Sequence, residues 1–377
     1  MSKILVIGAG YVGKAIAIDL AKKYEVTSGD IDAGALQVLS DKYQIKTKIL
    51  DVKRSESFNE AIKQFDIVIS AVPGHLGLRT MNQVIKEGKN LVDISFMPED
   101  AMRLDELAKA NDVAVIMDCG VAPGLPNFII GYYNELMKID KVEYYVGGLP
   151  KVRTGPFEYK ATFSPIDVIE EYIRPARFIE NGKPFSKPAM SDPELIEFEK
   201  AGTLEAFNTD GLRSLLFTMN QIPDMREKTL RYPGHIKLVK AFMDSGFFSS
   251  KPVIINDVSV KPLDLTLKLL FDNWKLNEDD EEFTVLRVKI SGTENGIGKE
   301  IIYDLYDEYD YASKTSSMAR TTGYTASAAA DMLLNNLFSE KGVFPPEHVG
   351  KYGNCFNHVL DYLKERNIIL RKTEIIK

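Results

Sequence analysis

Residues 3–13 read KILVIGAGYVG, in which an apolar run precedes the pattern G-x-G-x-x-G at Gly8, Gly10 and Gly13. The apolar run predicts a buried strand, and Tyr11 to Lys23 predict an amphipathic helix, so the glycines fall at the turn between the two. Gly8 permits the tight turn, Gly10 lets the backbone approach a pyrophosphate, and Gly13 lets the helix pack closely on the strand. The helix N-terminus then faces the anion, so we expect a bound dinucleotide.

The residue that closes the second predicted strand indicates which dinucleotide binds. Strand residues Glu25–Gly29 are followed by Asp30, whose carboxylate can accept hydrogen bonds from both ribose hydroxyls of adenosine and would repel a 2′-phosphate. We therefore predict NAD rather than NADP. The predicted cofactor-binding residues are Gly8, Gly10, Tyr11, Val12, Asp30, Ile31, Asp51, Val52, Ala71, Val72, Pro73 and His75.

The first third of the chain alternates strands and helices. We expect further strands at 45–50, 66–71, 90–94 and 113–117, and helices at 55–64, 76–86 and 98–110. Near-continuous apolar strands alternating with helices indicate an α/β fold with a doubly wound, Rossmann-type parallel sheet, which we expect to end near Gly124.

A different pattern follows Leu125. We expect a helix to about Lys138, a strand at 142–146, a Gly/Pro-rich bend at 147–150, a helix at 165–172, a charged irregular stretch at 183–200, helices at 234–245 and 264–271, and strands at 283–290 and 299–306. Asn295-Gly296 predicts a hairpin between the last two strands. This pattern indicates a second, α+β domain, which we expect to hold the substrate.

From Ser316 the chain is predicted to be helical again, with a small-residue face formed by Gly323, Ala326 and Ala328–Ala330. We expect this helix to return to the first domain and seal the cofactor cleft. The predicted division is residues 1–124 plus 312–377 for the NAD domain and 125–311 for the substrate domain.

Composition limits the possible function classes. The chain has 377 residues and a formal charge of −7 without a basic stripe, so we expect no nucleic-acid partner. Its two cysteines and the absence of a long apolar run or a leader before Lys3 favour a cytoplasmic protein that does not enter a membrane. Its four histidines are not spaced as metal ligands, so we expect no metal site.

Candidate catalytic and substrate-binding residues lie at strand ends and in the second domain. Asp118 and Glu99 are predicted to handle protons, although Asp118 can equally cap a turn. Arg231 is predicted to hold a substrate carboxylate, or else to form a surface ion pair. Asp210 is predicted to bind an amine, or else to cap a helix that begins at Leu212. The remaining substrate-binding candidates are Thr209, His235 and Ser95.

Several motifs resemble the saccharopine dehydrogenase-like family across nearly the whole chain, in order. They are AVPG (71–74), LVDISFMPE (91–99), CGVAPGL (119–125), GGLP (147–150), TLRYPGH (229–235) and RTTG (320–323). The likeness is greatest to members that oxidise lysine, because saccharopine-cleaving members carry Asp where this chain has Ala122.

The resemblance implies an NAD-dependent oxidoreductase that acts on a CH–NH₂ group of a small amino acid. The implied reaction is oxidative deamination of the L-lysine ε-amine to 2-aminoadipate 6-semialdehyde, which cyclises to piperideine-6-carboxylate. It also implies a homodimer built through the substrate-domain sheet, and a place in lysine degradation. Alternatives are a saccharopine or carboxynorspermidine dehydrogenase, or a non-catalytic NAD-binding regulator.

Overall fold

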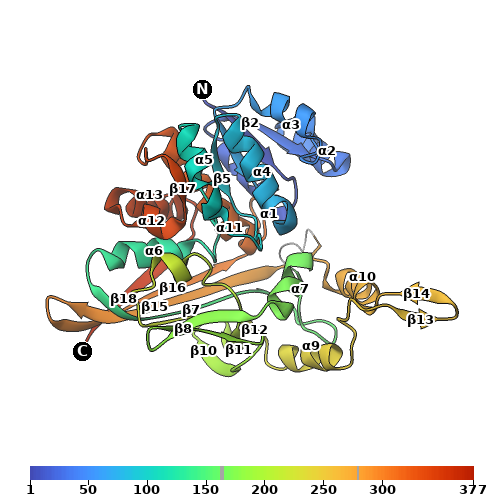
Figure 1. Ribbon diagram of the computed structural model, residues 1–377, viewed down its shortest axis with the longest axis vertical. Coiled ribbons are helices and arrows are strands. Elements are labelled where there is room, and N and C mark those ends of the chain that lie inside the picture. The colour runs from blue at the N-terminus through green and yellow to red at the C-terminus, as the bar shows by residue number, and fades with distance from the viewer. Residues whose placement is uncertain (162–164, 278–279) are drawn as a thin grey trace.

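The computed structural model describes residues 1–161, 165–277 and 280–377. These residues form two large sheets with helices packed between and around them, and one small two-stranded sheet (Figure 1). The first sheet is wholly parallel, in the order β17-β6-β5-β4-β1-β2-β3. Its strands are β1 (Lys3–Ile7), β2 (Glu25–Asp30), β3 (Lys46–Ile49), β4 (Ile67–Ser70), β5 (Asn90–Asp93), β6 (Ala114–Ile116) and β17 (Gly342–Phe344). The predicted doubly wound α/β domain with a second domain is therefore confirmed.

Alternate residues of the central strands enter different cores, which explains their continuous apolar runs. Ile4 and Val6 pack on one face of the sheet, whereas Leu5 and Ile7 pack on the other. Both faces are covered by helices, as a buried parallel sheet requires. These helices are α1 (Tyr11–Leu20), α2 (Ala33–Tyr43), α3 (Ser55–Ile62), α4 (Gly74–Lys86), the 3-10 turn η1 (Ala101–Leu104) and α5 (Asp105–Ala110).

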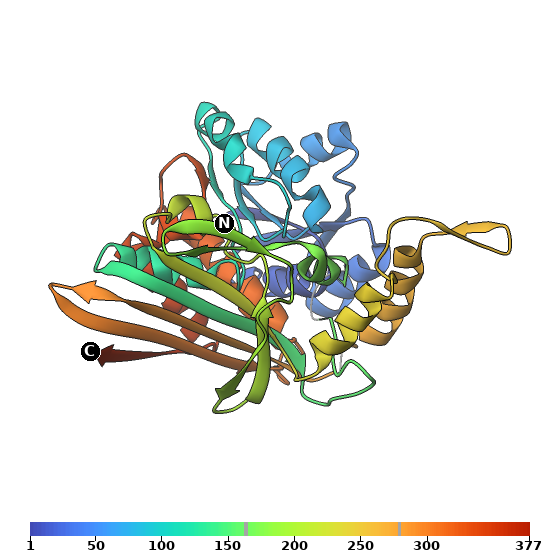
Figure 2. The same cartoon turned by 60° about the horizontal axis from the view of Figure 1, so that its bottom comes forward.

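The second sheet is mixed and runs beneath the first domain, as Figure 2 shows. Its main path is β10-β11-β12-β7-β15-β16-β18; in addition, β8 pairs with β12, and β9 pairs with β8. The strands are β7 (Lys138–Pro150), β8 (Ala176–Glu180), β9 (Lys183–Lys187), β10 (Glu194–Phe198), β11 (Gly202–Asn208), β12 (Asp224–Arg231), β15 (Glu282–Glu294), β16 (Ile297–Glu308) and β18 (Leu370–Ile376). Asn295 and Gly296 form the predicted turn between β15 and β16.

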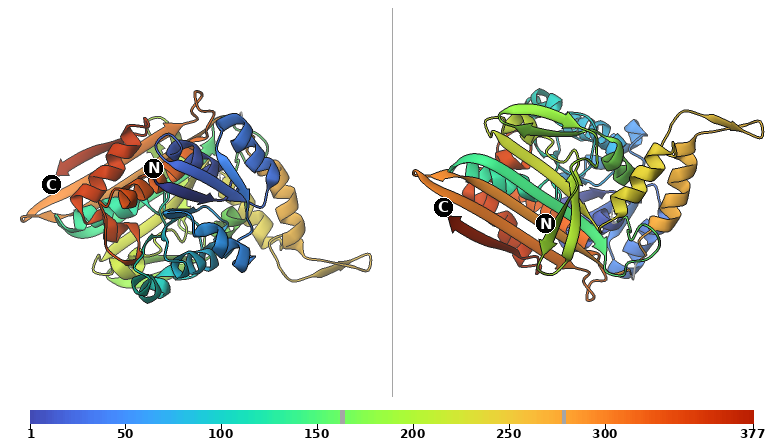
Figure 3. Two further views of the ribbon diagram at one scale, coloured as in Figure 1. Left: turned by 90° about the horizontal axis from the view of Figure 1, so that it is seen from above. Right: turned by 90° about the horizontal axis from the view of Figure 1, so that it is seen from below.

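Helices of the middle region flank this sheet, and a two-stranded hairpin extends away from it (Figure 3). The helices are α6 (Leu125–Asn134), α7 (Pro165–Ile173), α8 (Leu215–Thr218), α9 (His235–Asp244) and α10 (Pro262–Trp274), and the hairpin is β13 (Val253–Ile255) with β14 (Val258–Val260). No helix in the described ranges is both long and apolar enough to cross a membrane.

The last part of the chain contributes to both sheets. Helix α11 (Ser317–Leu334) packs against α1, where a Cβ on Gly323 would lie 3.1 Å from Ile16 Cγ1. Strand β17 extends the first sheet at β6, and β18 pairs with β16 in the second. Helices α12 (Pro346–Gly350) and α13 (Gly353–Lys364) lie between these strands in the sequence.

Two expectations for the second domain are wrong. Residues 147–150 continue strand β7 instead of forming a bend, because Gly147 has no side chain and the neighbouring strand passes very close to it. A Cβ at Gly147 would lie 2.7 Å from the carbonyl oxygen of Leu230. The charged stretch 183–200 is not irregular but contains β9 and β10, whose exposed faces carry the charges.

Candidate functional site

A cavity of about 600 Å³ lies between the two domains, at the carboxyl ends of the parallel strands. This is the edge at which open α/β sheets bind ligands. Its walls come from the loops after β1 to β6, from β7, β12 and α7 of the second domain, and from α11. The predicted residues that line it are Gly8, Gly10, Tyr11, Val12, Asp30, Ile31, Asp51, Val52, Ala71, Val72, Pro73, Ser95, Asp118 and Arg231.

The glycine loop provides a cradle that fits a dinucleotide. Gly8 has φ +102°, and a Cβ there would lie 2.5 Å from the carbonyl oxygen of Ala71. A Cβ on Gly13 would lie 2.0 Å from the carbonyl oxygen of Gly8, so helix and strand are in direct backbone contact. A Cβ on Gly10 would meet nothing within 4 Å, so this glycine leaves the space at the start of α1 open.

Asp30 is held in place at the adenosine end of the cavity. Its Oδ2 accepts a hydrogen bond from the Ala9 amide at 2.6 Å, and its Oδ1 accepts from the Asp32 amide at 2.9 Å. Each carboxylate oxygen still has a lone pair for a ribose hydroxyl. Asp51 also lines this end, together with Lys53, a cation that the sequence reasoning overlooked.

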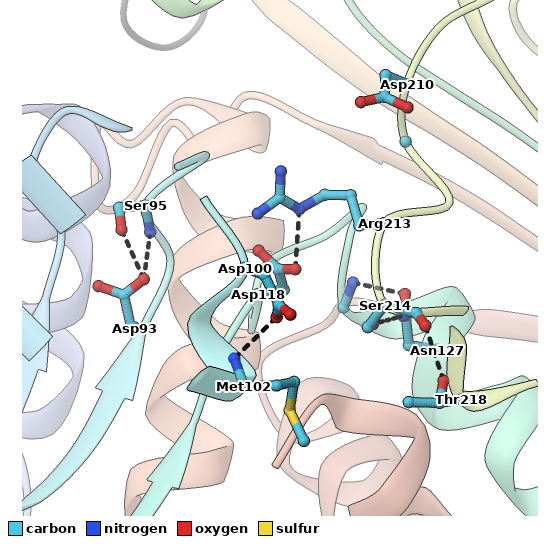
Figure 4. A network of polar contacts seen from close by, with 12 residues as sticks. Asp93, Ser95, Asp100, Met102, Asp118, Asn127, Asp210, Arg213, Ser214 and Thr218 are labelled. Carbon is cyan, nitrogen blue, oxygen red and sulfur yellow. Dashed lines mark hydrogen bonds and ion pairs between the residues drawn. The ribbon is translucent and has the colours of Figure 1, made fainter. Parts of the chain in front are cut away.

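Asp118 lines the cavity and forms a buried ion pair. It follows β6 with φ +49°, and its Oδ2 accepts from Arg213 Nε at 2.8 Å (Figure 4). The side chains of Arg213 and Asp118 are only 7% and 1% exposed. The second oxygen, Oδ1, is buried without a hydrogen-bond partner in the described part of the chain. The carboxylate is therefore oriented by one cation and keeps an acceptor available beside the cavity.

Arg231 ends β12 and is held by a chain of hydrogen bonds. It donates from Nε to the Tyr172 hydroxyl (3.0 Å), from Nη1 to the Leu230 carbonyl (2.9 Å) and from Nη2 to Glu171 Oε2 (3.1 Å). Guanidinium carries five N–H groups, so these bonds leave one N–H on each Nη for another acceptor. Arg231 lies on the cavity wall, so a substrate carboxylate is a suitable acceptor.

His235 lies behind Arg231, outside the set of cavity-lining residues. Its Nδ1 is 2.9 Å from the Phe157 carbonyl, which can only accept, so Nδ1 carries the proton and Nε2 accepts from the Tyr172 hydroxyl at 2.9 Å. Burial, together with the charge of Arg231, lowers the pKa of His235 to about 3, so the ring is neutral. Its contacts orient Tyr172, which in turn orients Arg231.

The other predicted residues lie elsewhere or have other partners. Asp210 accepts two hydrogen bonds of 2.8 Å from Arg177, and it does not cap a helix, because α8 begins only at Leu215. In Figure 4 it lies apart from Arg213 and Asp118. Thr209 donates to Glu227 Oε2 at 2.6 Å. Those outside the cavity lining are Glu99, His75, Asp210, Thr209 and His235.

Ser95 lies on the cavity wall, but its hydroxyl is directed to a buried carboxyl group. It donates from both Oγ (2.6 Å) and the amide nitrogen (3.0 Å) to Asp93 Oδ2 (Figure 4). Burial raises the pKa of Asp93 to about 7.

Sequence reasoning missed several cavity residues that depend on tertiary placement. Phe96 lines the cavity and contacts two guanidinium groups, those of Arg174 and Arg213, each 4.8 Å from its ring centroid. Asp167 and Glu171, four residues apart on α7, both line the substrate side of the cavity. The i, i+4 spacing of two acids was visible in the sequence, but it did not show what that helix face would meet.

Comparison with known proteins gives two family matches that follow one another along the chain. Residues 4–116 match the saccharopine dehydrogenase NADP binding domain, and residues 120–369 match the saccharopine dehydrogenase C-terminal domain. The mitochondrial α-aminoadipic semialdehyde synthase of Mus musculus is 26% identical over 263 residues, which are 66% of this chain and 28% of that protein. The chain thus spans under a third of that relative's length. The NADP⁺, L-glutamate-forming saccharopine dehydrogenase of Pyricularia oryzae is 25% identical over 271 residues, covering 66% and 58% of the two chains.

Solved structures show the same fold. The apo saccharopine dehydrogenase (L-Glu forming) of Saccharomyces cerevisiae has a TM-score of 0.82 at 19% identity, with both chains covered completely. The homospermidine synthase of Legionella pneumophila, solved with NAD, has a TM-score of 0.71 at 12% identity, covering 99% of this chain and 91% of that one. With both family matches in sequence order and almost no residue left outside them, this chain belongs to the saccharopine dehydrogenase family of oxidoreductases and carries its NAD(P)-binding domain.

Proposed function

We propose that this protein is an L-lysine 6-dehydrogenase, which uses NAD to oxidise the ε-amine of L-lysine. The observation that carries the proposal is the charge at the substrate end of the cavity. The charged residues that line this end within the described chain are three acids, Asp118, Asp167 and Glu171, and one base, Arg231. Arg213 pairs with Asp118 from outside the lining, so the acids exceed the bases by one. A substrate with two amines and one carboxylate matches this balance better than saccharopine, which carries three carboxylates.

The preference for NAD rests on the other end of the cavity. Two carboxylates, Asp30 and Asp51, line it against one cation, Lys53. Asp30 is also fixed by two backbone amides, so it would not easily turn away from a 2′-phosphate. The net negative charge favours the cofactor without that phosphate.

The chemistry requires a proton acceptor, a fixed substrate and a hydride acceptor. The ε-ammonium of lysine, with a pKa of about 10.4, must lose a proton before its carbon can give up hydride. Asp118 Oδ1 faces no protein donor and can take that proton. Arg231 holds the α-carboxylate. The bound nicotinamide supplies the hydride acceptor. Water then converts the substrate imine to the 6-semialdehyde and ammonium. Overall, one lysine, one NAD⁺ and one water give one semialdehyde, one ammonium, one NADH and one proton.

Saccharopine oxidation is the second candidate, and two observations favour it. Several relatives are named saccharopine dehydrogenases. Arg174 and Arg213 also lie on the ring of Phe96, a cavity-lining residue, so their charges could attract additional carboxylates. Arg213 is neutralised by Asp118, however, and Arg174 lies 3.7 Å from Glu170.

The test is a substrate screen with the purified full chain. NADH or NADPH formation is followed by absorbance with lysine, saccharopine and carboxynorspermidine, each with NAD and with NADP. We expect the highest kcat/KM for lysine with NAD, and release of one ammonium per NADH. A higher kcat/KM with saccharopine would refute the lysine assignment, and no reduction with any pair would favour a regulator that only binds NAD.

A further inference from the structure

Arg231 and Glu171 form a compact pair of opposite charges on the substrate wall of the cavity. Arg231 Nη2 and Glu171 Oε2 are 3.1 Å apart, and both residues line the same cavity. The Glu171 side chain is 19% exposed, whereas the Arg231 side chain is 3% exposed. The Glu171 carboxylate is thus the more accessible of the two groups, although most of its side chain is also buried.

An amino acid carries the same two kinds of charge, a carboxylate and an ammonium, next to each other on its α-carbon. The nitrogen and the carboxyl carbon are separated by two bonds. A protein guanidinium next to a protein carboxylate is therefore complementary to them, since the guanidinium can face the ligand carboxylate and the protein carboxylate can face the ammonium. We infer that Arg231 and Glu171 together form a subsite for an α-amino acid head group, in which Glu171 binds the α-ammonium while Arg231 binds the α-carboxylate. This inference rests on the proposed function only in so far as the substrate is an amino acid.

The surroundings support an ionised Glu171 that can accept from an ammonium. Burial raises the pKa of Glu171, but the charge of Arg231 opposes this rise, and a bound ammonium would oppose it further. Asp167, one turn earlier on α7, adds a second negative charge to the same wall. Asp210, the amine-binding candidate from the sequence, already has a bidentate partner in Arg177, so it does not compete for this role.

The subsite also explains how one cavity can handle two chemically similar amines. A substrate whose α-ammonium is held by Glu171 points its other end along the cavity, and Asp118 is the acid that remains for the reacting amine. Recognition and proton transfer are therefore assigned to different carboxylates. In the D-enantiomer the α-ammonium and the α-carboxylate exchange places when the side chain keeps its direction along the cavity. One charge would then be misplaced, so the subsite predicts a preference for the L-enantiomer.

The experiment compares ligands that cannot react. L-Norleucine has the head group of lysine without the ε-amine, and hexanoate lacks the α-ammonium as well. Binding of each to the full chain saturated with NADH is measured by calorimetry for the wild type, Glu171→Gln and the neighbouring control Glu170→Gln, whose side chain is 50% exposed. L-Lysine turnover is measured in parallel.

We expect Glu171→Gln to weaken L-norleucine binding about tenfold to a hundredfold while it changes hexanoate binding little. Glu170→Gln removes only the partner of Arg174, so any effect should be the same for both ligands, because both carry one carboxylate. Equal weakening of both ligands would show that Glu171 acts only by supporting Arg231, and this would overturn the subsite, as would no effect at all.

Measurements on the wild type keep the inference testable if Glu171→Gln does not fold. L-Norleucine should then bind at least about tenfold more tightly than hexanoate and than D-norleucine, and equal affinities would refute the subsite. If lysine gives no NADH but L-norleucine binding still depends on Glu171, the proposed reaction fails and the amino-acid subsite stands. If lysine is oxidised and Glu171 has no effect, the reaction stands and the subsite fails.

Discussion

Replacement of Asp118 by Asn tests the proposed proton acceptor, and the structure predicts two separable effects. The first is on stability. Asp118 is the buried partner of Arg213 at 2.8 Å, and Asn would remove the one carboxylate that this guanidinium contacts as an ion pair among the described residues. Loss of one member of a buried pair typically costs about 3–5 kcal/mol, part of which Asn recovers because its side-chain oxygen can still accept from Nε. We therefore expect a clear fall in the unfolding free energy, with the protein still folded at 25 °C.

The second effect is on the reaction. A positioned general base contributes roughly 10²–10⁴-fold to a rate, so kcat should fall by about that factor, while NAD affinity remains near its original value. Part of the lost rate should return at alkaline pH, because more lysine then arrives with its ε-amine already deprotonated. A purely structural Asp118 would show no such recovery.

The assay combines chemical denaturation, NAD binding and steady-state kinetics from pH 7 to pH 10. Arg213→Met provides the matched control, since it breaks the same ion pair but keeps the carboxylate. We expect this variant to lose stability as well, yet to retain much more of its kcat than Asp118→Asn. A folded Asp118→Asn protein with kcat near that of the wild type, or one whose rate loss equals that of Arg213→Met at every pH, would refute the reasoning.

Other variants test the remaining parts of the argument. Asp30→Ser combined with Ile31→Arg should shift the kcat/KM ratio toward NADP, and a wild-type protein that already prefers NADP would contradict the role of Asp30. Arg231→Ala should raise KM for lysine about tenfold to a hundredfold and leave NAD affinity nearly unchanged, so an unaltered KM would exclude the anchor. Burial raises the pKa of Glu282, whose side chain is fully enclosed, from 4.5 to about 8, so the folded state holds a proton that the unfolded state releases. The unfolding free energy should consequently decline as pH rises from about 4.5 to 8, and Glu282→Gln should flatten this decline. An equally steep decline in that variant would show that other groups, such as the nearby Asp307, cause it.

The first domain could be predicted closely because its signals are local. The strands have continuous apolar residues, and the glycines of residues 8–13 have roles that a short segment determines by itself. The second domain gave weaker signals. Gly147 resembles a turn residue until the close approach of Leu230 is known, and the charges of 183–200 hide two strands whose pairing partners, β8 and β11, lie elsewhere in the chain.

The site residues also differ in how well the sequence predicts them, according to whether their signal is local or tertiary. Asp30 and the glycine loop belong to a motif, so the sequence placed them at the cavity. Asp210 and Glu171 are both acids near helices, and only the fold shows that Arg177 occupies the first while the second borders the cavity beside Arg231. Which side chains from distant segments contact each other depends on the tertiary fold, so a short stretch of sequence does not reveal it.

The pairing of β17 with β6 affects how the chain folds while it is being synthesised. Strand β6 is synthesised early, but the strand that covers its outer edge, Gly342–Phe344, is added only after the strands of the second sheet from β7 to β16. Until then β6 has an open edge with unpaired amides and carbonyls, which is a template for pairing with other chains. The completed sheet also requires a contact between segments far apart in the sequence, which slows folding. Newly synthesised chains should therefore depend on chaperone protection for longer than a free-standing dinucleotide-binding domain would.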